Sequence, residues 1–337
     1  MSTTQGALER LLNHIWYGNS FLSWCLIPLT WPVRWVIHRR RQQASPKGST
    51  PEGVTVIVVG GLTAGGTGKT PVLIGLGKWL AEQGYRVGVV SRGYGGTHGP
   101  EPYSVTEADT AAVVGDEPLL IRRELGAPVV VCTDRKRALD VLVDQGAVDV
   151  VLSDDGLQHY LMPRDIELLV LDAERGLGNG RLLPAGPLRE PASRLTNVDV
   201  VLERNSCDPD RGFSYQPSGA LHLASGRQVR WSECVAEWRD QSMVAMTGLG
   251  QPRQFFEMLM GQGLAIEAES LGDHKAMTQA HLDRRDEQVL LMTAKDAVKL
   301  SECTDPRVWV VAIEVALPSS LLTKLTALLP SARFVEA

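Results

Sequence analysis

The chain has few cysteines, and they follow no pattern that would bind a metal or form a disulfide framework. Its five cysteines lie far apart without a CxxC pair, which excludes a disulfide scaffold and a zinc knuckle and makes a reducing compartment the default. With 33 glycines, 19 prolines and 44% apolar residues among 337, collagen-like and disordered classes are excluded as well. The length predicts a globular protein of two domains, and no internal repeat is visible.

The charge is unevenly distributed. Residues 1–50 hold six basic residues and one acidic residue, a net +5, so residues 51–337 carry −10 of the total −5. General nucleic-acid binding needs a broad cationic surface that displaces counterions from phosphates. The acidic body therefore predicts that nucleic acid is not a partner.

Residues 16–37 contain half of the tryptophans and precede a run of basic residues at 38–41. Tryptophan favours the headgroup level of a bilayer, and arginine is attracted to anionic lipid. Two prolines and an arginine interrupt the span, so it is a poor transmembrane helix, and its charges follow the apolar stretch, unlike those of a signal peptide. We expect residues 1–50 to form a helical segment on a membrane surface; packing of two short helices on the protein's own core remains the alternative.

From residue 54, short β-branched runs alternate with helical stretches, which predicts a doubly wound, mostly parallel α/β sheet. We expect this core at 51–204, a linker with short antiparallel strands at 205–240, and a smaller α/β domain at 241–337. Strands are expected at 54–59, 86–90, 128–132, 149–153, 166–171, 199–203, 243–247, 289–293 and 308–313. Helices are expected at 68–83, 117–124, 135–144 and 253–262.

The first expected strand runs into the sequence GGLTAGGTGKTP at residues 60–71. In such a loop, glycines let backbone N–H groups surround phosphates, the lysine reaches the β and γ oxygens, and the hydroxyl holds Mg²⁺. Threonine stands at 63 where the common pattern has glycine, and alanine stands at 64 where related GGxGK[ST] loops usually have lysine. The motif predicts a P-loop NTPase-like core that binds ATP and Mg²⁺, with Gly65, Gly66, Gly68, Lys69 and Thr70 in these roles.

A second part of the site is expected after the strand at 149–153, which leads into the sequence DDGLQH at 154–159. Open α/β sheets bind ligands at the carboxyl ends of their strands, and a P-loop site needs a carboxylate there for its metal ion. Asp-Asp-Gly alone is also an everyday turn. Together with the P-loop, it indicates a nucleotide and metal site.

Seven blocks in this order carry a resemblance to a known family: GGLTAGGTGKTP, SRGYGG, GDEP, SDDGLQH, LLPAGPLREP, GDH and TAKDAVK. The chain closely resembles the tetraacyldisaccharide 4′-kinase family of lipid A synthesis over essentially its whole length. The resemblance implies transfer of the ATP γ-phosphoryl group to the 4′-hydroxyl of a tetraacylated glucosamine disaccharide 1-phosphate, forming lipid IVA. It further implies a peripheral or monotopic enzyme, expected to be a monomer, at the cytoplasmic face of the bacterial inner membrane.

The resemblance also implies roles for individual residues. Asp116 would act on the proton of the acceptor hydroxyl, aided by His274. The family's phosphate loop falls on Thr63, Ala64, Gly65, Gly66, Thr67, Gly68, Lys69 and Thr70. The remaining implied site residues are Lys69 and Asp155 in catalysis, Thr70, Asp154 and Glu117 at the metal ion, and Gln158 and His159 at the nucleotide. From the residues alone, Asp116 could cap a helix, Asp273-His274 could be a solvated turn, and His159 could be a packing residue.

Other positions stay open. Arg189 and Glu190 could bind the sugar or its phosphate, or belong to a rigid connector, and Thr293, Lys295 and Asp296 could face the nucleotide from the second domain. The sequence departs from the family pattern at Gly61, Gly272 and Ala294. Two rival functions are a membrane-recruited P-loop ATPase, which would want a lysine at 64, and a soluble kinase, which would leave the tryptophan-rich segment unexplained.

Overall fold

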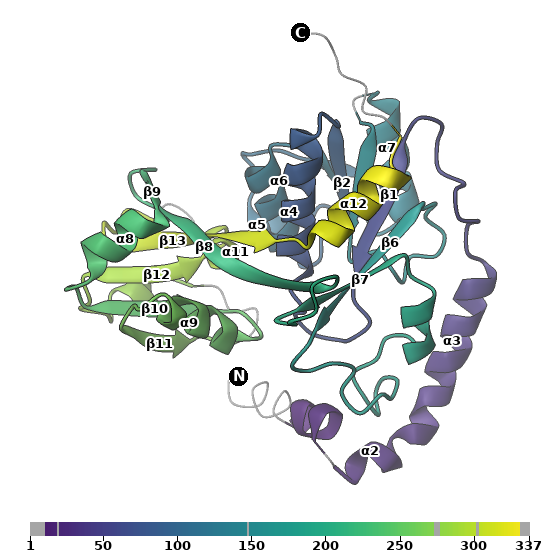
Figure 1. The fold of residues 1–337 in the computed structure, drawn as a ribbon, viewed down its shortest axis with the longest axis horizontal. Coiled ribbons are helices and arrows are strands. Elements are labelled where there is room, and N and C mark those ends of the chain that lie inside the picture. The colour runs from purple at the N-terminus through teal and green to yellow at the C-terminus, as the bar shows by residue number, and fades with distance from the viewer. Residues whose placement is uncertain (1–10, 19, 147, 273–276, 301–302, 331–337) are drawn as a thin grey trace.

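A computed structural model describes residues 11–18, 20–146, 148–272, 277–300 and 303–330 (Figure 1). Within them the strands form one continuous sheet in the order β11-β10-β12-β13-β8-β7-β6-β1-β5-β2-β4-β3, with β9 paired to β8. The chain divides this sheet into a larger part around β1 and a smaller part around β10 (Figure 1). The doubly wound, mostly parallel core with a second, smaller α/β unit agrees with the sequence prediction.

The larger part has a parallel core with helices on both faces. Its strands are β1 (Thr55–Gly60), β2 (Val87–Ser91), β3 (Tyr103–Val105), β4 (Val129–Val131), β5 (Val150–Asp154), β6 (Ile166–Asp172) and β7 (Val200–Arg204). Its helices are α4 (Lys69–Glu82), α5 (Ala111–Val114), α6 (Asp116–Leu125) and α7 (Arg135–Asp144), and a 3-10 turn, η2 (Ala192–Thr196), precedes β7. Every residue of β1, β2, β4, β5 and β6 is buried, which explains their β-branched runs. Apolar side chains of α4 and α6 cover one face, and those of α7 cover the other.

The smaller part is a second sheet with its own core. Its strands are β8 (Gly212–His222), β9 (Gln228–Arg230), β10 (Met243–Thr247), β11 (Ile266–Ser270), β12 (Val289–Thr293) and β13 (Val308–Ala316). Its helices are α8 (Trp231–Trp238), α9 (Pro252–Gly261), α10 (Gln279–Leu282) and α11 (Ala294–Ala297). Trp231 and Trp238 of α8 pack with Phe255 and Leu259 of α9 on one face of this sheet.

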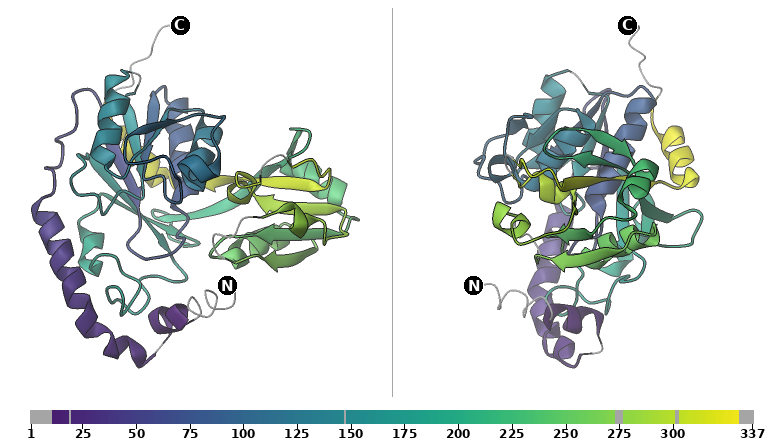
Figure 2. Two further views of the ribbon diagram at one scale, coloured as in Figure 1. Left: turned by 180° about the vertical axis from the view of Figure 1, so that it is seen from behind. Right: turned by 90° about the vertical axis from the view of Figure 1, so that its left-hand side faces the viewer.

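The connection between the parts is a strand and not a loose linker. β8 pairs in parallel with β7 at its first residues and antiparallel with β13 along the rest of its length. The last helix, α12 (Ser319–Leu328), crosses back and buries Leu321 and Leu325 in the core of the larger part (Figure 2). Because the chain crosses twice, the smaller part is not a simple carboxyl-terminal appendage.

Strands and helices expected from the sequence are present within two residues of their predicted bounds, except that β13 continues three residues further, to Ala316. The sequence analysis did not predict β3, α5, η2, α8, β11, α10, α11 and α12. One of these, α8, lies in the stretch 205–240, where only short antiparallel strands were expected. In β11 no residue is buried, so the apolar signal that marks the central strands is absent.

The amino-terminal segment runs along one side of the larger part (Figures 1 and 2). Residues 11–17 are helical, and α2 (Leu22–Cys25), a 3-10 turn η1 (Ile27–Leu29) and α3 (Thr30–Gln42) follow. Large apolar side chains along it face solvent, with Phe21 76% exposed and Trp31 71% exposed. None of the helices in the described ranges combines the length and the apolar character needed to cross a bilayer.

Candidate active site

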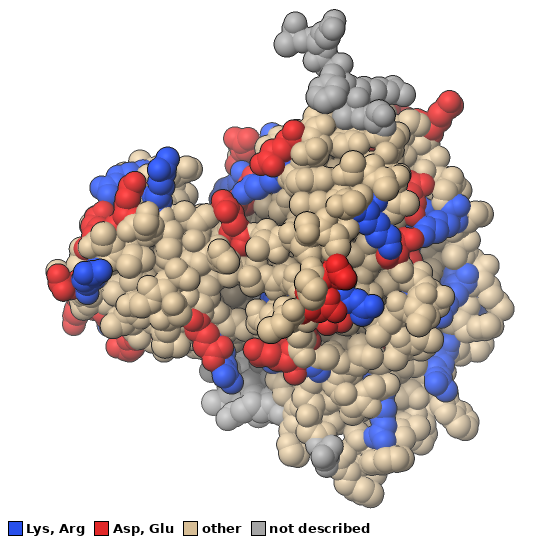
Figure 3. Space-filling view, viewed as in Figure 1, with Lys and Arg blue, Asp and Glu red and all other residues tan. Residues whose placement is uncertain are grey.

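One cleft of about 2220 Å³ joins the two parts of the molecule and extends to α3. Its walls include the glycine-rich loop, the carboxyl end of β5, the start of α11, and the α3 side chains Val33 and Val36. Figure 3 shows the hollow between the smaller part and the body of the molecule. The cleft therefore connects the loop predicted to bind phosphate with the helix predicted to lie on a membrane.

The glycine-rich loop lies between β1 and α4, as the motif predicts. Gly68 has a left-handed backbone (φ 82°), and a side chain there would collide with the hydroxyl of Tyr215. Gly65 and Gly66 would meet nothing within 4 Å, so the loop is open on that side. Tyr215 donates a hydrogen bond to the carbonyl of Gly68 (2.6 Å), and Gln251 of the smaller part donates one to the carbonyl of Gly66 (2.7 Å).

The first two residues of the expected loop, Thr63 and Ala64, form backbone contacts with a neighbouring segment. The backbone N–H of Ala64 donates to the carbonyl of Pro187 (2.8 Å), and Thr63 forms a β-bridge with Leu188. Thr63 and Ala64 are thus paired with a neighbouring segment, and the open phosphate cradle begins at Gly65. The departure from the common loop pattern falls at this pairing.

Asp154 is the last residue of β5 and Asp155 is the next residue in the chain, and their carboxylates lie in contrasting environments. Asp154 is buried and accepts a hydrogen bond from Ser91 (2.9 Å); burial, with the negative charges of Glu117 and Asp155, raises its pKa to about 7. Asp155 lies 3.5 Å from the ammonium of Lys69 and 2.7 Å from the guanidinium of Arg189. Burial alone would raise the pKa of Asp155, but these two cations outweigh it and hold the pKa at about 2.

An arginine that the sequence analysis missed lies beneath this strand end. Arg135 is 3% exposed and donates a hydrogen bond to the backbone carbonyl of Asp154 (2.6 Å). Its Nε and Nη1 atoms have no hydrogen-bond partner among the described residues. Its position at the start of α7, just after β4, was the available signal, because that edge of the sheet also holds Asp154.

Gln158 and His159 line the same cleft. The side-chain amide of Gln158 donates to the carbonyl of Gly61, at the start of the loop (3.2 Å). Burial and the charges of Arg135 and Arg92 lower the pKa of His159 to about 3. The imidazole is therefore neutral near pH 7.

Asp116 and Glu117 open helix α6 and face lysines of the smaller part. Glu117 lies 2.7 Å from Lys295, and Asp116 lies 3.8 Å from Lys295 and 3.4 Å from Lys299. Asp116 is the first residue of α6, and Gly115 occupies the capping position. Among the described residues, the one backbone N–H that donates to the Asp116 carboxylate is that of Glu117 (3.0 Å). The helix-cap alternative is therefore not supported. His274 lies outside the described residues.

Three residues left open by the sequence are assigned by their contacts. Arg189 pairs with Asp155, whereas Glu190 is completely buried and thus out of reach of a sugar. Asp296 is also completely buried and accepts hydrogen bonds from Thr247 (2.7 Å) and Thr293 (2.6 Å). Asp296 joins the ends of two strands, and Lys295 beside it faces the cleft.

The residues named for a metal ion suit a cation that arrives with a nucleotide. Mg²⁺ is usually held by one or two carboxylates together with substrate phosphates and water. The pKa of Asp154 is raised by burial first and then by the negative charges of Glu117 and Asp155, which a divalent cation would compensate. Across the described ranges, no three His, Cys, Asp or Glu residues form a ready-made metal cage. Thr70, Asp154 and Glu117 supply the oxygen donors that such an ion prefers.

The doubly wound sheet and the loop between β1 and α4 define a nucleotide-binding protein of the P-loop class. The chain belongs to the tetraacyldisaccharide-1-P 4′-kinase family, whose family model matches residues 22–330. It is 40% identical over 326 residues to the tetraacyldisaccharide 4′-kinase of Alcanivorax borkumensis, covering 95% of this chain and 97% of that protein. It is 38% identical over 317 residues to the same enzyme of Legionella pneumophila (strain Corby), covering 92% and 94%.

A solved structure has the same fold. LpxK from Aquifex aeolicus, crystallised in complex with ATP, matches with a TM-score of 0.74 and 25% identity. The match covers 92% of this chain and all of that one. The likeness therefore includes both parts of the sheet.

Proposed function

We propose that this protein transfers the γ-phosphoryl group of ATP to the 4′-hydroxyl of a tetraacylated glucosamine disaccharide 1-phosphate, forming lipid IVA. We place this reaction at the cytoplasmic face of the bacterial inner membrane, with the protein bound peripherally as a monomer. The observation that carries the proposal is the single cleft shared by the glycine-rich loop, Asp116 and the solvent-exposed helix α3. Membership of the 4′-kinase family supports the substrate class.

ATP would enter with its phosphates along Gly65–Thr70, at the amino-terminal end of α4, where the helix dipole favours negative charge. Lys69 would contact the β and γ phosphates, and Asp155, 3.5 Å from its ammonium group, would orient it. Mg²⁺, held by Thr70, Asp154 and Glu117, would supply charge neutralisation on the phosphates. Because phosphoryl transfer depends mainly on position and charge, these residues account for the ATP half of the reaction.

The acceptor half would centre on Asp116. Its carboxylate would accept the proton of the 4′-hydroxyl as the hydroxyl oxygen bonds to the γ-phosphorus and the bond to the β–γ bridging oxygen breaks. Lys295 and Lys299 approach Asp116 from the smaller part, so charged side chains from both sides of the cleft meet at Asp116. We keep His274 as the proposed partner of Asp116, together with closure of the cleft before transfer.

The lipid acceptor explains the exposed aromatic residues. Each buried CH₂ group contributes about 0.8 kcal/mol to membrane attachment, so a lipid with four acyl chains stays in the bilayer. The enzyme must therefore come to the surface. The exposed rings of Phe21, Trp24, Trp31 and Trp35 and the arginines of α3 suit the headgroup region of an anionic membrane.

The test is transfer of labelled phosphate from ATP to the purified acylated disaccharide 1-phosphate in detergent. Lys69→Ala is expected to lower the rate by about 10²–10³-fold, the scale for removal of a preorganised charge. Asp116→Ala should also abolish most of the labelled lipid. Lys78→Ala is the matched control on the same helix, because Lys78 makes only a surface pair with Glu124.

Two outcomes would contradict parts of the proposal. ATP turnover that is independent of the acceptor lipid would favour a switch ATPase. Near-native transfer by Asp116→Ala would remove Asp116 as the base while leaving the substrate assignment in place.

A further inference from the structure

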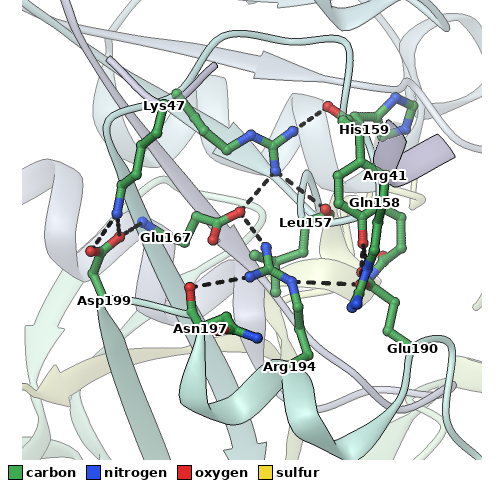
Figure 4. Close-up of polar contacts among 12 residues, drawn as sticks. Arg41, Lys47, Leu157, Gln158, His159, Glu167, Glu190, Arg194, Asn197 and Asp199 are labelled. Carbon is green, nitrogen blue, oxygen red and sulfur yellow. Dashed lines mark hydrogen bonds and ion pairs between the residues drawn. The ribbon is translucent and has the colours of Figure 1, made fainter. Parts of the chain in front are cut away.

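A chain of contacts connects the surface helix α3 to the phosphate loop through the buried carboxylate of Glu190. Arg41, in the last turn of α3, lies 2.9 Å from Glu190 and donates a hydrogen bond to the hydroxyl of Tyr160 (3.1 Å). The Tyr160 hydroxyl itself donates to Glu190. The Glu190 side chain is 1% exposed, so its charge depends on these partners and on Arg194 at 3.5 Å (Figure 4).

From Glu190 the connection continues to the loop. The amide nitrogen of Gln158 lies 3.1 Å from Glu190 and 3.2 Å from the carbonyl of Gly61, so one side chain bridges both. Arg189, the residue before Glu190, donates its backbone N–H to Leu62 (2.7 Å) and pairs through its side chain with Asp155. Movement of Glu190 would therefore shift the start of the loop and the counter-ion of Lys69 together.

The segment before Glu190 also holds the rest of the amino-terminal helices. Trp16 donates its indole N–H to Pro184 (3.0 Å), and Arg181 donates to the hydroxyl of Ser23 (2.6 Å). The guanidinium of Arg181 also stacks over the ring of Trp24 at 3.9 Å. The same stretch of chain, 179–190, thus contacts the exposed amino-terminal helices on one side and the phosphate loop on the other.

The contacts of Glu190 involve charged side chains, which simple packing of the segment against α3 would not require. A buried carboxylate that loses one of its charged partners has less compensation for its charge, so the position of Glu190 depends on Arg41 as well as on Arg194 and Tyr160. A purely structural role would be served equally well by apolar residues at these positions. A charged link that ends on the loop carbonyl instead makes the loop geometry sensitive to α3.

We propose that Glu190 is a positioning residue for the phosphate loop and that Arg41 makes its position depend on α3, so that contact of α3 with a lipid surface tightens ATP binding. The surface contact rests on the proposed function. The reciprocal consequence is that ATP strengthens attachment to the surface by the same factor.

The experiment measures the affinity of the full chain for fluorescently labelled ATP with Mg²⁺, with and without vesicles of phosphatidylethanolamine and phosphatidylglycerol. Vesicles should tighten ATP binding by the wild type by about fivefold or more, the usual lower range of coupling between two sites. Arg41→Gln should bind ATP about fivefold more weakly than the wild type and should lose the response to vesicles. Arg239→Gln removes the same charge from an exposed site next to α8, away from α3 and outside the cleft, and should keep both properties.

Glu190→Gln serves as the second variant if Arg41→Gln does not fold, because it removes the buried charge while keeping the volume and an oxygen for Gln158. It should melt cooperatively and lack the vesicle response. Equal vesicle responses in Arg239→Gln and either of the other variants would overturn the proposal, as would a wild type whose ATP affinity does not change when vesicles are added. No acceptor lipid is used, so failure here is distinct from failure of lipid phosphorylation.

Discussion

An aspartate lies just beyond the carboxyl end of each of two strands, β5 and β12, but the two carboxylates have different kinds of partners. Each carboxyl end belongs to a buried parallel strand facing the cleft, and each is followed by an aspartate: Asp155 after β5 and Asp296 after β12. Asp296 is completely buried and its carboxylate accepts three short hydrogen bonds from its own part of the fold. Asp155 is partly exposed and is held by two cations instead.

The difference separates a carboxylate that neutral donors fix from a carboxylate that two cations hold, at equivalent places in the fold. Neutral donors fix the Asp296 carboxylate between two strand ends, so these hydrogen bonds contribute to the stability of the fold. Lys69 and Arg189 give Asp155 a charge-dependent partnership that a polyphosphate can rearrange when it enters. The cleft is therefore chemically asymmetric: the larger part offers the loop and the acids, and the smaller part offers Lys295 and Lys299.

The largest effect should come from Asp155→Asn. Loss of the negative charge removes the ion-pair partner of Lys69, so phosphate transfer should fall by about 10²–10³-fold while the fold persists. Transfer of labelled phosphate and circular dichroism measure the two quantities. Asp149→Asn is the matched control, because Asp149 precedes the same strand at its other end, where it pairs with Arg86 (2.7 Å). Equal losses in both variants would mean that Asp155 only stabilises the strand.

Asp296→Asn should produce the reverse pattern. Hydrogen bonds to a charged group contribute about 1.5–3 kcal/mol, so the free energy of unfolding should fall by an amount on that scale. The rate of transfer per folded molecule should change by less than about threefold. Chemical denaturation and the kinase assay separate these effects. A stable Asp296→Asn enzyme with a large loss of rate would place Asp296 in the catalytic machinery and end the contrast with Asp155.

The smallest effect concerns acid stability and His159. Folding lowers the pKa of His159 from 6.5 to about 3, so between these values the unfolded chain binds a proton that the folded protein does not. This contribution to stability is complete above pH 6.5 and is lost as the pH falls toward 3. The melting temperature of His159→Gln should therefore decline less steeply than that of the wild type between pH 6.5 and 4. Parallel curves would show that burial and the charges of Arg135 and Arg92 do not lower the pKa of His159.

Much of the molecule was predictable because its signals are local. Buried β-branched runs marked β1, β5 and β6, and the pattern from Gly65 to Thr70 marked the phosphate loop without any knowledge of the fold. The acidic sequence at Asp154 could be placed on the same edge of the sheet, since carboxyl ends of parallel strands lie together. The sequence also showed that tryptophans and arginines gather in the amino-terminal segment, but it left open whether that segment packs on the protein's own core.

What only the tertiary structure decided are the partnerships between distant residues. The sequence determined that a triphosphate-binding turn, two adjacent carboxylates and an aromatic, basic amino-terminal segment exist in one chain. Folding decided that Asp154 has a raised pKa and Asp155 a lowered one, that Thr63 and Ala64 pair with 187–188, and that Arg41 reaches a buried Glu190 149 residues away. The physical reason is that burial and charge contact act through space, and spacing along the chain does not reveal which groups will share a site.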